Sequence, residues 1–215
     1  MTAPAPNRWY FDPLSPFACL QWPKIKALRR DVPITPVPIL LAAVLDARGQ
    51  KGPAEIPSKR EFTYRHVMWQ ARQAGVPLRF PARHPFNPLP ALRLCVAAGA
   101  SERVIDAVFA WIWIEGRAAD SVEAILPLCE AVQVDPALLG HDTVKATLRA
   151  NTEQALREGV FGVPTLAVGD GAEPALFWGN DSHDFAAAVL HEPSLLEEAE
   201  FQRLARLPVG VSRTG

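Results

Sequence analysis

Residues 159–168 read Gly-Val-Phe-Gly-Val-Pro-Thr-Leu-Ala-Val. Because proline has no amide hydrogen to donate to a neighbouring strand, an apolar run that contains Pro164 is not expected to form a central strand along its whole length. The pattern is typical of a turn that enters a strand at Pro164. Only about one X–Pro bond in twenty is cis in folded proteins, so these residues alone favour a trans Val163-Pro164 bond.

The start of the chain predicts a strand, a helix and a second strand. Residues 8–11, Arg-Trp-Tyr-Phe, are short, aromatic and typical of a strand. Ser15 is a suitable N-cap and Pro16 suits the first position of a helix, so a helix is expected from Pro16 onward. Residues 33–40 predict a second strand that several prolines interrupt.

The next part of the chain is mainly helical. Apolar spacing and capping residues predict helices at 41–48, 59–75, 91–98, 104–115, from 121 onward and from 142 to 159. The strand signal returns at 164–168 and 175–178, followed by helices at 181–190 and 194–207. Trp111 and Trp113 lie two residues apart and cannot share one face of an α-helix, so Trp111 is assigned to the core and the place of Trp113 stays open.

This order, β-α-β, then helices, then β-β-α, is that of a thioredoxin-like fold. It predicts an α/β protein with a large helical insertion. Residues 7–40 and 160–192 are expected to form the thioredoxin-like domain. Residues 41–159 would form the helical insertion domain, and residues 193–215 a C-terminal helix and tail.

Composition excludes several classes of protein. The 215 residues are 49% hydrophobic and 21% charged, with a net charge of −1. This composition supports a sizeable core, and the absence of a basic stripe argues against nucleic-acid binding. No apolar run is long enough to span a membrane. The N-terminus has no apolar signal region, so a cytoplasmic protein is expected.

The cysteines are three widely spaced residues, Cys19, Cys95 and Cys129. Without a C-x-x-C pattern, they form neither a zinc motif nor a dithiol redox motif. Three reduced and mostly buried thiols are therefore expected. No metal site is predicted, because the histidines also lack metal-ligand spacing.

Four motifs in order resemble those of 2-hydroxychromene-2-carboxylate isomerases. They are Phe-Asp-Pro-Leu-Ser-Pro-Phe at 11–17, Pro-Phe-Asn at 85–87, Phe-Gly-Val-Pro-Thr at 161–165 and Phe-Trp-Gly-Asn-Asp at 177–181. These isomerases are related to kappa-class glutathione transferases and, more distantly, to DsbA-type disulfide oxidoreductases. The resemblance covers residues 7–190, and it implies glutathione as the cofactor and a homodimeric assembly.

Ser15 is the expected catalytic residue. Thiol oxidoreductases carry C-x-x-C at the N-terminus of this helix, where the helix dipole and free N–H groups stabilise a thiolate. Here those two positions hold Ser15 and Ala18, and Cys19 comes one residue too late, so dithiol exchange is not expected. The resemblance implies that the Ser15 hydroxyl donates a hydrogen bond to the glutathione sulfur, which lowers the pKa of the thiol. The simpler alternative is that Ser15 only caps the helix.

The resemblance also implies residues that hold the rest of glutathione. Despite the low base rate, it predicts a cis Val163-Pro164 bond, because this bond would present the Val163 main chain as an open edge, with which a short peptide can pair as an added strand. Asp181 would pair with the γ-glutamyl ammonium group while Asn180 helps to hold its carboxylate. Capping of the following helix is the alternative for these two residues.

The glycyl carboxylate of glutathione needs a cation. The family uses an asparagine-containing loop and a downstream lysine, and Lys59 matches that lysine. The asparagine position holds Gln50 or Lys51 instead, which is a departure from the family pattern. A solvated surface lysine is the alternative interpretation of Lys59.

An aromatic acid substrate needs a cation for its carboxylate and an apolar slot for its ring. Arg83 or His84 could supply the cation, and Asn87 belongs to the same polar and aromatic loop. The ring could lie against Phe17, Phe86 or Trp69. Phe86 and Trp69 could equally be core residues.

By resemblance, the expected reaction interconverts 2-hydroxychromene-2-carboxylate and open-chain hydroxybenzylidene pyruvate, with glutathione regenerated. A nearby cation would stabilise the enolate that develops beside the carboxylate. Two alternatives stay open: a kappa-like glutathione transferase that acts on electrophiles, and a glutathione-binding module of thioredoxin fold without turnover.

Overall fold

The sheet of this protein contains four strands in the part of the chain that the structure describes. The structure is a computed structural model that describes residues 7–169, 171 and 173–211. The strands are β1 (Asn7–Phe11), β2 (Ile34–Pro38), β3 (Thr165–Val168) and β4 (Ala175–Trp178), in the order β2-β1-β3-β4. β2 runs parallel to β1, whereas β3 and β4 are antiparallel to their neighbours.

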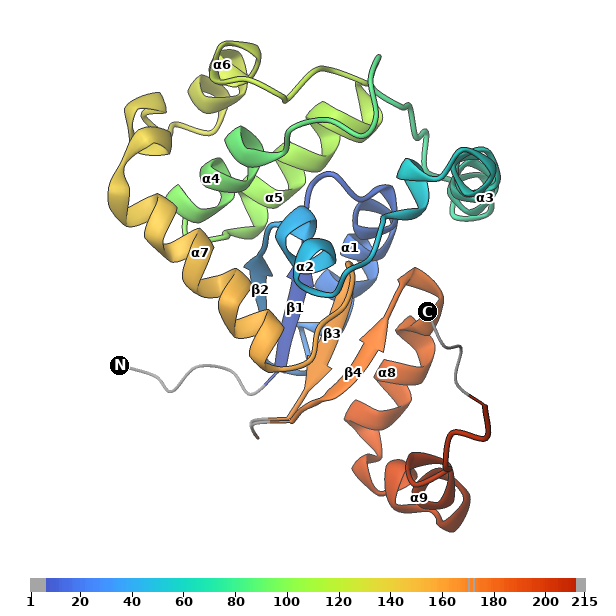
Figure 1. Ribbon diagram of the computed structural model, residues 1–215. Coiled ribbons are helices and arrows are strands. Elements are labelled where there is room, and N and C mark those ends of the chain that lie inside the picture. The colour runs from blue at the N-terminus through green and yellow to red at the C-terminus, as the bar shows by residue number, and fades with distance from the viewer. Residues whose placement is uncertain (1–6, 170, 172, 212–215) are drawn as a thin grey trace.

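Helices follow the strands in the predicted order. They are α1 (Pro16–Leu28), α2 (Leu41–Ala47), α3 (Pro57–Gln73), α4 (Leu89–Ala97), α5 (Glu102–Phe109), α6 (Val122–Ala131), α7 (Asp142–Arg157), α8 (His183–His191) and α9 (Ala199–Ala205). In Figure 1, α4, α5 and α6 lie above the sheet, α8 lies beside β4, and α3 projects to the right. This arrangement confirms the thioredoxin-like fold with a helical insertion.

Alternating side chains on the strands divide the core into two faces, because successive residues of a strand point to opposite sides. Trp9, Phe11 and Leu166 pack in one cluster with residues of α1 and α8 and with the insertion helices. Tyr10 and Ala167 pack on the other face with residues of α2 and α7. Both faces of the sheet are therefore covered by helices.

The structure differs from the prediction in two places. Trp111 and Trp113 are both buried, because a turn of π-helix over Ala110–Ile114 follows α5 and breaks the α-helical spacing. The predicted terminal helix at 194–207 is instead a short 3-10 turn, Pro193–Glu197, followed by α9. Residues 212–215 of the predicted tail lie outside the described residues. No helix in the described ranges is long and apolar enough to cross a membrane.

Candidate active site

One end of the sheet gathers three segments that are distant in the sequence. The register pairs Tyr10 with Thr165, and Thr165 with Trp178. The residues that follow β1, precede β3 and follow β4 therefore meet at the same end. These segments, residues 12–15, 163–164 and 179–181, belong to three of the four motifs that carry the family resemblance.

Ser15 is the N-cap of α1, as predicted. It has an extended backbone, with φ −87° and ψ 116°, and its Oγ accepts a hydrogen bond from the Ala18 amide at 3.3 Å. Pro16 occupies the first position of the helix, where its missing N–H costs nothing. No acceptor for the Ser15 hydroxyl proton is found among the described residues. This buried hydroxyl thus keeps a free donor at a helix N-terminus.

Asp12 fixes the loop between β1 and α1. Its carboxylate accepts hydrogen bonds from the amides of Leu14 at 2.9 Å and Leu41 at 3.0 Å. The side chain is fully buried, and this burial raises the pKa of Asp12 to about 7, although the two amides oppose the shift. Asp12 thereby joins the approach to Ser15 to the start of α2.

The Val163-Pro164 bond is cis, which confirms the prediction made for it. The main chain of Val163 makes no hydrogen bond within the part of the chain that the structure describes. The carbonyl of Pro164, in contrast, accepts from the Gly179 amide at 2.9 Å and so joins the start of β3 to the end of β4. The main-chain N–H and C=O groups of Val163 are thus unpaired among the described residues at this end of the sheet.

Asn180 and Asp181 lie in a 3-10 turn, Asn180–Ser182, between β4 and α8. Neither side chain caps α8, which has no side-chain capping bond. Asn180 is buried, and its amide group donates to Gln70 Oε1 at 2.8 Å. Its Oδ1 is also buried but has no partner among the described residues. An unpaired buried oxygen is costly, and a ligand that donates a hydrogen bond would relieve the cost. Asp181 is exposed beside it.

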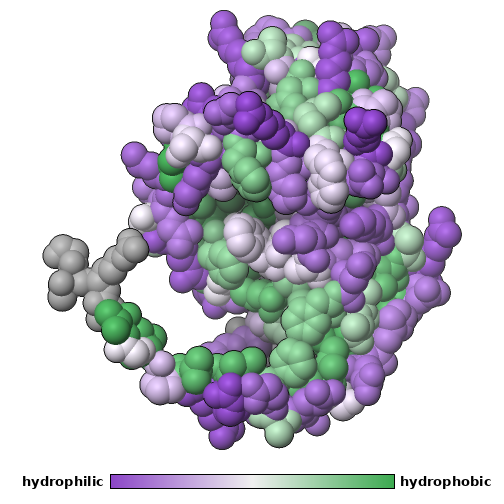
Figure 2. All heavy atoms as spheres, turned by 90° about the vertical axis from the view of Figure 1, so that its right-hand side faces the viewer, coloured by the Kyte–Doolittle hydropathy of each residue, from purple (hydrophilic) through white to green (hydrophobic). Residues whose placement is uncertain are grey.

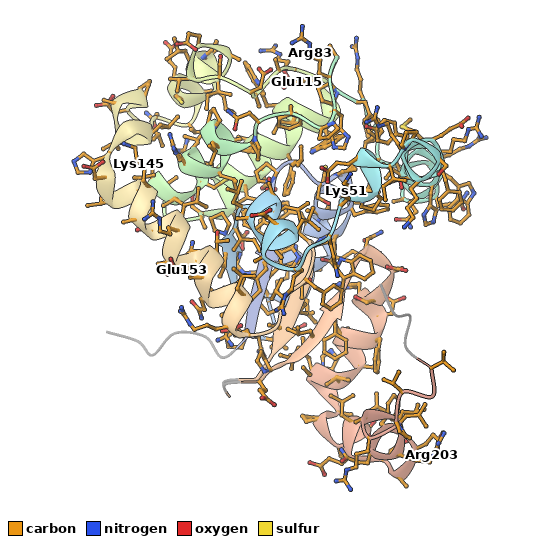
Figure 3. All side chains as sticks on the ribbon, in the orientation of Figure 1. Lys51, Arg83, Glu115, Lys145, Glu153 and Arg203 are labelled. Carbon is orange, nitrogen blue, oxygen red and sulfur yellow. The ribbon has the colours of Figure 1, made fainter. Side chains whose placement is uncertain are left out.

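Gln50, Lys51 and Lys59 are exposed along the connection from α2 to α3 and in the first turn of α3. Neither lysine forms an ion pair with a described residue. Figure 3 shows Lys51 on this connection near the centre of the molecule and Arg83 far from it, at the upper edge. Lys51 is therefore better placed than Arg83 to meet a ligand that also touches α1.

The loop from residue 79 to residue 90 uses its polar groups within the protein. Both ring nitrogens of His84 have protein partners, and the Asn87 side chain contacts the carbonyl of Asp120 and the amide of Leu89. Phe86 packs against the core cluster. Arg83 and Phe86 also line a small pocket of about 180 Å³, whose other lining residues are Pro81, Ala82, Ala118, Ala119 and Asp120.

An aromatic row on α3 meets the first turn of α1 instead. Phe62, His66 and Trp69 follow one face of α3 at spacings of four and three residues. The His66 ring is 5.6 Å from Phe62, 6.2 Å from Trp69 and 6.1 Å from Phe17, which lies in the first turn of α1. Phe62 and Trp69 are 67% and 57% exposed, so Trp69 is not a core residue. Figure 2 faces the side of the molecule on which α3 lies and shows hydrophobic and hydrophilic residues side by side there.

The three cysteines are unpaired and buried, as expected. Burial raises the pKa of the Cys19 thiol to about 12, so Cys19 is not an activated nucleophile despite its place near the start of α1. With Ala18 at the other position of the missing C-x-x-C, a dithiol pair is absent from this helix.

Several residues of the site escaped the sequence analysis. Trp113 donates from Nε1 to the Pro13 carbonyl at 2.8 Å, and Gln21 donates to the Gly179 carbonyl at 3.0 Å. Tyr64 and Gln70 on α3 contact His84 and Asn180. Only the aromatic spacing on the otherwise polar helix α3 gave a usable signal; the other contacts join residues far apart in the sequence.

A family model described as a DSBA-like thioredoxin domain matches residues 8–191. The chain belongs to this DSBA-like thioredoxin family. The match spans both the strands of the sheet and the helical insertion between β2 and β3.

Within the family, the chain is similar to isomerases and to glutathione transferases. It is 32% identical to a 2-hydroxychromene-2-carboxylate isomerase of Pseudomonas putida over 80% of this chain and 88% of the relative. It is 26% identical to glutathione S-transferase kappa 2 of Caenorhabditis elegans, over 87% and 94% of the two chains. A solved structure of 2-hydroxychromene-2-carboxylate isomerase superposes with a TM-score of 0.71 at 25% identity, covering 90% of this chain and 98% of that one. These likenesses confirm the resemblance inferred from the four motifs.

Proposed function

We propose that this protein is a glutathione-dependent isomerase of 2-hydroxychromene-2-carboxylate or a similar aromatic 2-oxo/2-hydroxy acid. The observation that carries the proposal is the buried Ser15 hydroxyl, a free donor at the N-terminus of α1, at the same end of the sheet as the unpaired main chain of Val163. The names of the most similar relatives supply the reaction class.

The residues present fit glutathione. Val163 would pair with its cysteinyl unit, and Asn180, whose buried Oδ1 has no partner among the described residues, would accept from the γ-glutamyl end beside Asp181. The exposed cations Lys51 and Lys59, with Gln50, would meet the glycyl carboxylate. When bound, glutathione supplies a thiol that adds to a conjugated carbon and leaves after rotation about the resulting single bond.

The residues of the chain itself provide binding and polarity. Ser15 and the first amides of α1 favour negative charge at the sulfur position. The row of Phe17, Phe62, His66 and Trp69 offers a flat aromatic surface for the ring of the substrate. The proposal gives a less direct role to the loop residues Arg83, His84, Phe86 and Asn87. Their side chains contact the core, the pocket near residues 118–120 or neighbouring loops.

The three unpaired cysteines agree with a reducing compartment such as the cytoplasm. A homodimer is part of the proposal because of the family resemblance. Neither statement affects the assignment of Ser15.

A kappa-like glutathione transferase is the second candidate, because a transferase of that class is among the similar proteins. The two functions differ in what happens to glutathione. An isomerase regenerates it, whereas a transferase releases a conjugate.

The test measures by NMR the turnover of 2-hydroxychromene-2-carboxylate in the presence of a small amount of glutathione. An enzyme-free sample is the control. Conversion of many substrate molecules per glutathione, with the thiol recovered, would support the isomerase. Stoichiometric loss of glutathione with an electrophile would support the transferase instead. Binding of glutathione without turnover of either substrate would leave a binding module and contradict both enzymatic functions.

A further inference from the structure

The loop that leads into Ser15 is held by side chains from distant parts of the fold. Trp113 donates to the Pro13 carbonyl at 2.8 Å, and His84 Nε2 lies 3.0 Å from the Leu14 carbonyl. The Leu14–Ser15 peptide group is fixed at both ends, because the Ser15 amide donates to the Asp12 carbonyl at 2.9 Å. The orientation of this peptide group sets the backbone angle from which the Ser15 side chain leaves the chain.

The hydrogen bonds of His84 have a defined direction. A carbonyl oxygen can only accept, so Nε2 of His84 carries the proton that faces Leu14. Burial lowers the pKa of His84 and keeps the ring neutral near pH 7, so Nδ1 accepts. Two acceptors share the single proton of the Tyr64 hydroxyl: Nδ1 of His84 at 2.7 Å and the His84 carbonyl oxygen at 2.8 Å. Tyr64 on α3 is thus linked through His84 to the residue before Ser15.

Aromatic rings enclose the His84 imidazole. The ring centroids of Trp113, Phe80 and Phe86 lie 5.4, 5.7 and 6.2 Å from that of His84. With both nitrogens engaged and three rings around it, His84 has no free nitrogen for a substrate carboxylate. Its contacts are those of a side chain that supports other residues within the protein.

We propose that His84 is a positioning residue for Ser15: with Tyr64 behind it, it fixes the Leu14 carbonyl and so directs the Ser15 hydroxyl toward the glutathione sulfur. This proposal rests on the proposed function. It differs from the sequence-based expectation for His84, since it gives the imidazole a role within the protein in place of direct contact with substrate.

Three variants separate the hydrogen bond from the bulk of the ring. His84→Gln keeps an N–H donor that can reach the Leu14 carbonyl, His84→Leu removes it, and Tyr64→Phe removes only the hydroxyl. His191→Leu, at the exposed end of α8, is the matched control. The readouts are the affinity for glutathione by calorimetry, the titration of the bound thiol by thiolate absorbance, and hydrogen exchange of the amides of Leu14, Ser15, Phe17 and Ala18.

For His84→Leu, we expect a bound thiol that is ionised about five- to tenfold less at neutral pH, the effect of one lost hydrogen bond. The glutathione affinity should change less than twofold, since Val163, Asn180 and Asp181 are untouched. His84→Gln should restore most of the ionisation, and Tyr64→Phe should show an intermediate loss. A merely structural role would lower affinity and ionisation together, without rescue by glutamine.

An unchanged thiol titration in His84→Leu would overturn the proposal. If His84→Leu does not fold, Tyr64→Phe decides, and wild-type ionisation in that variant would also overturn it. If the unmodified protein does not bind glutathione at all, the proposed function fails. Hydrogen exchange still tests the positioning in that case: faster exchange of the Ser15 amide in His84→Leu but not in His84→Gln supports it, and equal rates contradict it.

Discussion

Ser15 accepts one hydrogen bond to begin α1 and keeps its own proton for another partner. A side chain with both capacities can cap the helix and contact a ligand at the same time. The two interpretations of Ser15 in the sequence are therefore compatible. Asp12 and His84 are the buried groups on which this arrangement depends.

Asp12 should make stability depend on pH. The pKa of its carboxyl group is raised from 3.8 to about 7 in the folded protein by burial. Between these values the folded state holds a proton that the unfolded state has released, so the free energy of unfolding falls as the pH rises from about 4 to about 7. The contribution is constant above the folded pKa.

The variant Asp12→Asn cannot ionise, and its unfolding free energy should lack this decline. Urea unfolding of both proteins between pH 4 and pH 8 measures the difference. Histidines titrate in both proteins and cancel in the comparison. If the unfolding free energies of the wild-type protein and Asp12→Asn changed in parallel with pH, Asp12 would be ionised in the folded state throughout this range.

At the scale of elements, the turn between β4 and α8 is the most constrained part of the site. Gly179 has φ +94°, its amide donates to Pro164, and its carbonyl accepts from Gln21 and Ser182. A Cβ at this position would lie 2.4 Å from Asp181 Oδ1. The turn therefore requires glycine both for its backbone and for the place of Asp181.

Gly179→Ala should destabilise the protein by about 1–2 kcal/mol and weaken glutathione binding, because Asp181 must move. Gly99→Ala is the control, since Gly99 also has positive φ, +62°, but open space around its Cβ position. Thermal unfolding and calorimetry with glutathione measure both effects. We expect both variants to lose stability and only Gly179→Ala to lose affinity; equal affinities would mean that this turn does not contact glutathione.

Elements with a local signature could be predicted, and contacts between them could not. Ser15-Pro16 marked the start of α1, and Gly-Val-Pro-Thr marked the entry to β3. The place of Trp113 stayed open because a π-helical turn is not visible in residue spacing. The contact between His84 and Leu14 joins residues 70 positions apart, and only the folded chain brings them together.

At the scale of the whole molecule, the sheet register brings residues 12–15, 163–164 and 179–181 to one end, and α3 adds its aromatic row to that end through Phe17 and Gln70. The motif order predicted that the first three segments would meet. The contribution of α3 could not be predicted, because an amphipathic pattern does not tell which neighbour a helix face meets.

A ligand that spans these segments should stabilise the folded chain. At a glutathione concentration of about 100 times its dissociation constant, the gain is about 2.7 kcal/mol, and for a protein of this size the Tm should rise by roughly 5–10 °C. Differential scanning calorimetry with increasing glutathione measures the shift, with free cysteine and glycine as controls. An equal Tm with and without glutathione would mean that the segments do not form one binding site.

The most direct test of the central claim is the titration of the glutathione thiol bound to the wild-type protein and to Ser15→Ala, followed by thiolate absorbance at saturating glutathione. A hydrogen bond to a charged acceptor contributes about 1.5–3 kcal/mol, so the bound thiol should titrate about one to two pH units higher in Ser15→Ala. Turnover near pH 7 should fall about ten- to a hundredfold, with a smaller change in glutathione affinity. An identical thiol titration in the two proteins would show that Ser15 only caps α1 and would contradict the assigned role.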